Sequence, residues 1–138
     1  MMDKWIKWEP IEELRESYNI SDIIDDGQEF TVLLSTLLHE NNKELRVTFK
    51  NCVEAYRSTR ESFRLETVGM VNESINSKEC ELSTLFKVTN SSYIKLLAAQ
   101  SNNTVDTSSF IHFAFYGVDL ILDVIATADP QVENITNG

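Results

Sequence analysis

Residues 30–50, FTVLLSTLLHENNKELRVTFK, form the stretch from which the fold is best predicted. The first six residues are mostly β-branched or apolar, which favours a strand. After a polar, turn-prone segment, Leu45, Val47 and Phe49 alternate with polar residues, as in a strand with one buried face. The stretch therefore predicts an antiparallel hairpin with a long loop.

The pattern changes on either side of this hairpin. After it, the alternation slips at Asn51 and resumes at Val53, which predicts a bulge or a bend. Before it, Asp-Asp-Gly at 25–27 is typical of a turn. Pro10 suits the first turn of a short helix, which we expect over residues 11–17.

Further strands and helices are expected from shorter patterns. Asn-Ser-Ser at 90–92 offers an N-cap for a helix over 93–100. Residues 59–80 predict either a short helix or an irregular crossover, and residues 118–127 fit a helix as well as a strand. Short apolar runs predict strands at 53–58, 85–88, 110–115 and 120–126.

The expected fold is α+β, with a single domain over residues 1–138. A curled antiparallel sheet of about five strands surrounds one core, and one or two short helices lie at its edge. The end segments, 1–9 and 130–138, are expected to be frayed.

The charge of the chain argues against two classes of partner. The chain has 12 basic and 22 acidic residues, a net charge of −10. Neither nucleic acid nor an anionic membrane is an expected partner, because binding to either needs a basic face. An acidic surface instead suits a cationic protein partner, since opposite fields speed the encounter. The alternative is that the charge serves solubility alone.

The sequence also bears on the compartment of the protein. No apolar run is long enough to span a membrane, and the start, MMDKWIKWEP, lacks the apolar region of a secretory signal. We therefore expect a cytoplasmic protein. Cys52 and Cys80 form no CxxC motif and predict neither a disulfide framework nor a zinc site. Cys52 lies in an apolar run and is expected to be a buried free thiol, and the alternative is a single bridge between the two cysteines.

Catalytic signatures are absent from the sequence. It contains no GxSxG, HExxH, GxGxxG or P-loop motif, so we predict no catalytic residue, no metal and no cofactor. One position leaves an alternative open. His112 lies inside an apolar strand, where it is either a hydrogen-bonded core residue or part of a pocket with Tyr116 and Tyr56.

Carboxylates near the start of the chain and in its last third form the predicted contact surface for a basic partner. The alternative is a set of solvated side chains with no partner. The contact residues are Glu9, Glu12, Glu13, Glu16, Asp22, Asp25, Asp26, Asp119 and Asp123.

Three segments carry a resemblance to a known group of proteins. They are MDKWIKWEP at 2–10, LFKVTNSSYIK at 85–95 and IHFAFY at 111–116. In these segments the chain resembles small, uncharacterised Bacillus-type cytosolic proteins that are encoded beside large polymorphic toxin genes. The resemblance implies an immunity-type or related orphan role with no known active site, and it assigns no functional residue.

Three functions are compatible with these observations. The first is a non-enzymatic interaction protein of the immunity type, which binds and neutralises a basic toxin domain through its acidic surface. The second is a small-ligand-binding or catalytic domain with a pocket near His112. The third is an oligomer-forming domain, in which Trp5 and Trp8 form a docking patch instead of covering the core.

Overall fold

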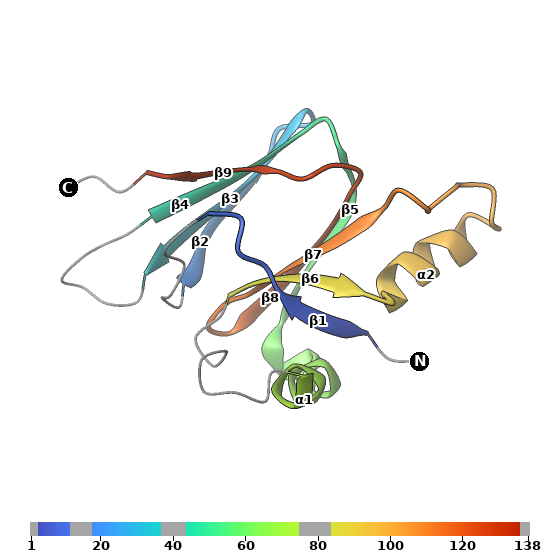
Figure 1. Ribbon diagram of the computed structural model, residues 1–138, viewed down its shortest axis with the longest axis horizontal. Coiled ribbons are helices and arrows are strands. Elements are labelled where there is room, and N and C mark those ends of the chain that lie inside the picture. Colours follow the sequence, from blue (N-terminus) through green and yellow to red (C-terminus); the bar gives the residue numbers. More distant parts are fainter. Residues whose placement is uncertain (1–2, 12–17, 37–43, 75–83, 136–138) are drawn as a thin grey trace.

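The computed structural model describes residues 3–11, 18–36, 44–74 and 84–135. These residues form nine strands in two antiparallel sheets, together with two α-helices and one short 3-10 helix (Figure 1). The strands are β1 (Lys4–Lys7), β2 (Tyr18–Asp25), β3 (Glu29–Thr36), β4 (Glu44–Lys50), β5 (Val53–Arg60), β6 (Leu85–Thr89), β7 (Ile111–Tyr116), β8 (Leu120–Ala126) and β9 (Gln131–Asn134). The helices are η1 (Glu61–Phe63), α1 (Leu65–Ser74) and α2 (Ser92–Gln100).

The hairpin expected from residues 30–50 is confirmed as the centre of the four-stranded sheet, whose order is β2-β3-β4-β9. In it, Phe30 of β3 lies opposite Phe49 of β4. The five-stranded sheet has the order β1-β6-β7-β8-β5, and all its neighbouring strands are antiparallel. Strands β6, β7 and β8 are consecutive strands in the sequence and form the centre of this sheet, whereas β1 and β5, which precede them in the chain, form its two edges.

The turn between β4 and β5 carries the chain from one sheet to the other. Asn51 in this turn has a φ of 51°, in the left-handed region that asparagine tolerates better than most residues. Its backbone N–H donates to the carbonyl of Gln28 over 2.8 Å. The predicted bend near Asn51 is therefore confirmed, and a register shift between Val53 and Ala55 follows it.

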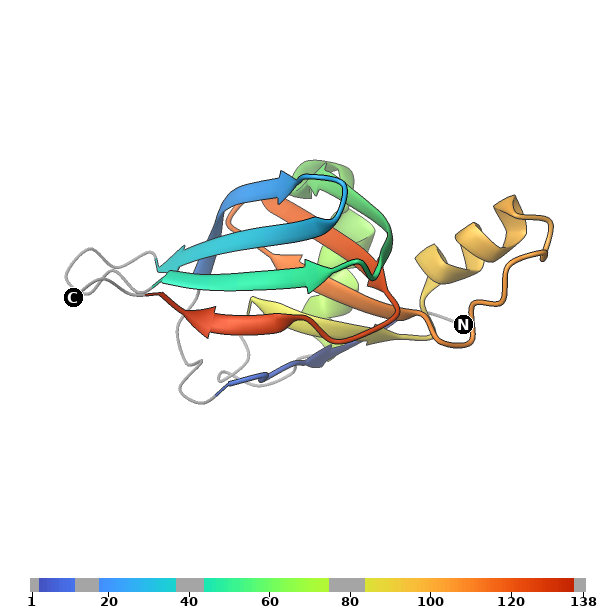
Figure 2. The same ribbon diagram turned by 90° about the horizontal axis from the view of Figure 1, so that it is seen from above.

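The main core lies between the two sheets, which pack face to face (Figures 1 and 2). Alternate residues of β3 and β4 meet alternate residues of β7 and β8 there. Phe49 and Phe113, one from each sheet, are both fully buried, with ring centroids 5.2 Å apart. Burying a side chain of this size contributes about 1.5–3 kcal/mol.

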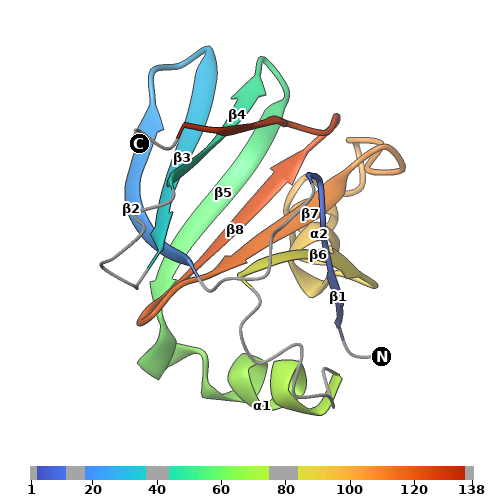
Figure 3. The ribbon, with the colours of Figure 1, turned by 60° about the vertical axis from the view of Figure 1, so that its left-hand side comes forward.

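The other face of the five-stranded sheet carries a second apolar cluster, built on Trp5, Phe86 and Ile121. Val68 of α1 packs against it, and Figure 3 shows α1 beside this sheet. Helix α2 projects beyond the ends of the strands (Figure 2). Trp5 is buried in this cluster, and Trp8 is half-buried against Phe113. The two tryptophans therefore cover apolar clusters instead of forming an exposed patch.

Several predicted elements are confirmed. Residues 85–88 and 120–126 are strands, and the helix over 93–100 begins after the expected cap segment. Residues 59–80 were expected to form either a short helix or an irregular crossover, and helix α1 occupies part of this stretch. Most of the helix expected over 11–17 lies outside the described residues. None of the described helices combines the length and apolar composition needed to cross a membrane.

Two expectations are wrong, and one open alternative is decided. The sheet is not one curled sheet of about five strands but two sheets, because the turn at Asn51 separates β4 from β5. Of the two alternatives left open for residues 118–127, the strand is confirmed as β8 and the helix is excluded, since β8 pairs on both sides with β7 and β5. Within the described residues of the end segments 1–9 and 130–138, residues 4–7 and 131–134 are not frayed, because β1 pairs with β6 and β9 pairs with β4.

Candidate functional site

A fully buried carboxylate, Asp123, lies in the middle of β8 with 0% of its surface exposed. Its neighbours Leu122 and Val124 belong to the core between the sheets. Because side chains alternate along a strand, Asp123 points to the opposite, helix-bearing face of the five-stranded sheet. The register places Arg57 of β5 directly opposite it.

His112 of β7 links this carboxylate to α2. Its Nε2 lies 2.6 Å from Asp123 Oδ1, and its Nδ1 lies 2.7 Å from Ser91 Oγ. A neutral ring with the proton on Nε2 satisfies both contacts, since it donates to the carboxylate and accepts from the hydroxyl. His112 is thus a hydrogen-bonded core residue, which was one of its two predicted roles.

Ser91 has a second task at the start of α2. Its Oγ accepts a hydrogen bond from the backbone N–H of Ile94 over 3.1 Å, as an N-cap residue does. The backbone N–H of Ser92, the first residue of α2, donates to Asp3 Oδ1 over 2.7 Å. The start of α2 is therefore tied both to the buried network and to the chain before β1.

Two arginines share the second oxygen of Asp123. Arg57 Nε donates to Oδ2 over 3.0 Å, and Arg64 Nη1 donates to the same atom over 2.7 Å. Arg64, which directly precedes α1, also donates from Nε to Thr67 Oγ1 over 3.1 Å. The Arg57 guanidinium lies over the ring of Tyr93, 4.3 Å from its centroid. The network thus joins β5, β7, β8 and the starts of both helices.

The pKa of Asp123 reflects this environment. Burial alone raises the pKa of a carboxyl group. At Asp123 the hydrogen bonds from His112 and Arg64, with the electrostatic attraction of these two side chains, outweigh burial and hold the pKa well below its usual range. Asp123 is therefore ionised at neutral pH and neutralises one of the two arginines.

The order Ser91–His112–Asp123 has the connectivity of an acyl-transfer triad, and its distances are within hydrogen-bonding range. However, Ser91 is only 5% exposed, and its oxygen is engaged by the helix cap. What the arrangement does most directly is to fix α1 and α2 on the sheet.

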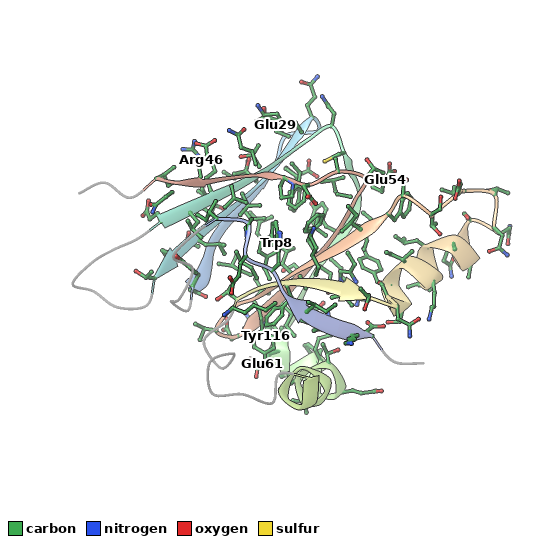
Figure 4. The ribbon with its side chains drawn as sticks, viewed as in Figure 1. Trp8, Glu29, Arg46, Glu54, Glu61 and Tyr116 are labelled. Carbon is green, nitrogen blue, oxygen red and sulfur yellow. The ribbon has the colours of Figure 1, made fainter. Side chains whose placement is uncertain are left out.

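The structure separates the three residues of the pocket predicted near His112. Tyr56 lies opposite Val124, on the core side of the sheet, with its ring 4.4 Å from that of Phe30. Tyr116 packs against Trp5, with ring centroids 6.4 Å apart. Burial and the nearby carboxylate of Glu61 raise the pKa of Tyr116 (Figure 4). The predicted pocket of His112, Tyr116 and Tyr56 is therefore wrong.

The predicted acidic contact residues differ in their exposure to solvent. The prediction that Asp123 is a surface contact is wrong, because its side chain is buried and hydrogen-bonds to side chains of the same chain. Asp119 is 76% exposed and lies 3.9 Å from Arg60, while Glu9 is exposed beside Lys7. The hairpin residues Asp22, Asp25 and Asp26 are all exposed. The remaining three, Glu12, Glu13 and Glu16, lie outside the described residues.

The tips of the β2–β3 and β4–β5 turns enclose a groove of about 380 Å³, here called the acidic groove. Two of its carboxylates, Glu29 and Glu54, are labelled at the top of Figure 4. Neither lysine nor arginine is among the described residues that line it. Its lining residues are Asp25, Gly27, Gln28, Glu29, Phe30, Asn51, Val53, Glu54, Ala55 and Tyr56.

The turn beside the acidic groove is ordered by its own carboxylates. Asp26 Oδ1 accepts from the N–H of Glu29 over 2.7 Å and from that of Gln28 over 2.9 Å, which lowers the pKa of Asp26. Asp25 Oδ1 accepts from Gly27 N–H over 3.0 Å. The turn predicted at 25–27 is confirmed. Glu54 was not among the predicted contacts, because it lies beside the β2–β3 turn only through the turn at Asn51, which is hydrogen-bonded to Gln28.

A second groove, of about 460 Å³, follows the outer face of the four-stranded sheet. Its floor includes Ile24, Leu33 and Thr48. Arg46, labelled in Figure 4, and Glu133 also line it and lie 3.7 Å apart. Because charges of both signs line this groove, it has less preference for a cationic partner than the acidic groove.

Other predicted features concern metals, thiols and relatives. Cys52 is a buried free thiol as predicted, and burial raises its pKa; Cys80 lies outside the described residues. Within the described ranges, no three His, Cys, Asp or Glu side chains are grouped as metal ligands. No family model, no curated protein and no solved structure matches this chain.

Proposed function

We propose that this protein is a non-enzymatic binding protein that docks on a basic protein domain through the acidic groove. The observation that carries the proposal is the composition of that groove, which is lined by the carboxylates of Asp25, Glu29 and Glu54 together with the exposed side chain of Tyr56. A lysine or arginine side chain of a partner fits such a site, because it pairs with the carboxylates and lies over the ring of Tyr56.

The electrostatics of the whole chain support this proposal. Its net charge of −10 raises the rate at which a cationic partner is met. Asp25 and Asp26 are held in fixed positions by backbone N–H groups, so little side-chain entropy is lost on binding. The resemblance to proteins encoded beside toxin genes favours a basic toxin domain as the partner and the cytoplasm as the place of binding.

The test measures binding to the toxin-like domain encoded nearest to the gene, by titration calorimetry at 50 and 300 mM NaCl. We expect that Asp25→Lys with Glu54→Lys weakens affinity at least about 100-fold, roughly 3 kcal/mol. The matched control, Asp106→Lys with Asp129→Lys, makes the same charge change at exposed sites outside the groove. Equal weakening by both pairs, or binding that salt does not affect, would refute docking in the acidic groove.

A second function, acyl transfer at Ser91, is favoured by one observation, the 2.7 and 2.6 Å contacts of His112. Its test is covalent labelling of the folded protein by a fluorophosphonate probe. Attachment at Ser91, lost in Ser91→Ala, would support catalysis. An unlabelled protein would count against it and leave the binding proposal unaffected.

A further inference from the structure

The buried network has an imbalance of charge. Two guanidinium groups donate to one carboxylate oxygen of Asp123, over 3.0 Å from Arg57 and 2.7 Å from Arg64. Asp123 is the sole carboxylate paired with either arginine among the residues that the structure describes. One positive charge therefore remains uncompensated. Arg64 is only 12% exposed, so solvent screens that charge less well than on an open surface.

The two arginines keep hydrogen-bond donors for another partner. Arg57 uses only Nε toward Asp123, and its two terminal amino groups have no acceptor within the described parts of the chain. Arg64 uses Nε and Nη1, which leaves Nη2 without an acceptor there. Arginine binds carboxylate and phosphate groups best through such terminal N–H groups.

Both guanidinium groups are already fixed in place. The ring of Tyr93 lies under Arg57 at 4.3 Å, and Thr67 accepts from Arg64 at 3.1 Å. An anion that binds here loses little affinity to side-chain ordering. The site is reachable from solvent, because 35% of the Arg57 side chain is exposed. Arg64 directly precedes α1, which lies beside the five-stranded sheet (Figure 3), and donates to Asp123 on the face of that sheet opposite the main core.

We propose that Arg57 and Arg64 together bind the oxyanion group of a small molecule, either a carboxylate or a phosphate. The oxyanion accepts hydrogen bonds from the terminal N–H groups of both arginines and compensates the positive charge that Asp123 leaves. This site is distinct from the acidic groove, since it is basic and its residues belong to the other face of the sheet.

The experiment titrates the full chain separately with inorganic phosphate and with acetate, at constant ionic strength set by chloride. The arginine side-chain N–H signals are followed by ¹⁵N NMR. We expect saturable shifts at Arg57 and Arg64 with a Kd of about 1 mM for at least one anion. Saturation by acetate alone would identify a carboxylate ligand, and saturation by phosphate alone a phosphate ligand.

Three variants make the result specific. Arg57→Gln is expected to weaken anion binding at least tenfold, whereas Arg60→Gln, a 73% exposed control at the end of the same strand, leaves the Kd unchanged. Arg57→Lys retains the charge but loses the planar fork, so it is expected to bind with intermediate affinity. The proposal is wrong if neither anion saturates the shifts, or if Arg57→Gln binds as tightly as Arg60→Gln in a folded protein.

Discussion

Replacing the buried carboxylate, Asp123→Asn, tests the account of the polar network most directly. The side chain keeps its shape, but Arg64 and Arg57 lose the one carboxylate that accepts from them among the residues that the structure describes. Removing one partner of a buried ion pair costs about 3–5 kcal/mol, because the other charge stays buried and unpaired. Arg57 is 35% exposed and can turn toward water, so the lower limit applies. We expect a loss of about 3 kcal/mol in the free energy of unfolding.

This loss is measurable by urea unfolding at pH 7, followed by the fluorescence of the buried and half-buried tryptophans Trp5 and Trp8. The midpoint should fall with no change in slope, and the melting temperature should fall by about 10 °C. The matched control is Asp119→Asn, which alters an exposed aspartate 3.9 Å from Arg60. It should change stability by no more than about 0.5 kcal/mol. A variant at Asp123 that is as stable as this control would refute the reasoning.

Three further predictions concern acid, the helix cap and the core. The pKa of Asp123 is lower in the folded state than its unfolded value of about 3.9, so its stabilisation is complete above about pH 4 and is lost as the pH falls below that value. The difference in free energy of unfolding between the native protein and Asp123→Asn should therefore shrink between pH 4 and pH 3. A difference that stays constant over this range would contradict a lowered pKa of Asp123. Ser91→Ala removes the cap of α2 and leaves the buried Nδ1 of His112 without its hydrogen-bond donor, so the free energy of unfolding in urea should fall by about 2 kcal/mol. The control Ser92→Ala, at the exposed neighbouring position, should lower it by less than about 0.5 kcal/mol. Phe49→Ala should cost about 3–5 kcal/mol by leaving a cavity between the sheets, and Phe63→Ala, at a 78% exposed ring, should cost almost nothing by the same measurement.

Local sequence patterns predicted those elements that are stabilised by their own residues. The strand with Leu45, Val47 and Phe49 has an alternating sequence because these three side chains point into the core, whereas Glu44, Arg46 and Lys50 on the other face are exposed. The helix after Ser91 was predicted for a similar reason, since its cap is three residues from the group that it satisfies. In both cases the decisive interaction is encoded within a few positions of the chain.

The two-sheet arrangement could not be predicted in this way. Strands β1 and β9 have four residues each, and they pair with strands distant in the sequence. Such pairing leaves no local pattern, so both segments were expected to be frayed. The crossing at Asn51 was seen only as a break in alternation, because a bend within one sheet and a passage between two sheets disturb the pattern equally.

The polar network gave a signal that was interpreted incorrectly. Asp123 is flanked by Leu122 and Val124, and His112 by Ile111 and Phe113, so each is a single polar residue within an apolar strand. Two such residues in predicted strands can pair across a sheet. Placing Asp123 on the surface ignored this pattern, whereas the register that joins it to Arg57 depends on tertiary structure alone.

The pairing of β9 with β4 also affects how the protein folds during synthesis. Leu45 and Val47 of β4 meet Asn134 and Val132 of β9, almost ninety positions later in the chain. One edge of the four-stranded sheet therefore stays open on the ribosome until residue 134 has emerged. Contacts so distant in sequence slow folding, and an open edge favours association with other chains. We expect the nascent protein to be most prone to association through this edge in the interval between emergence of β4 and emergence of β9.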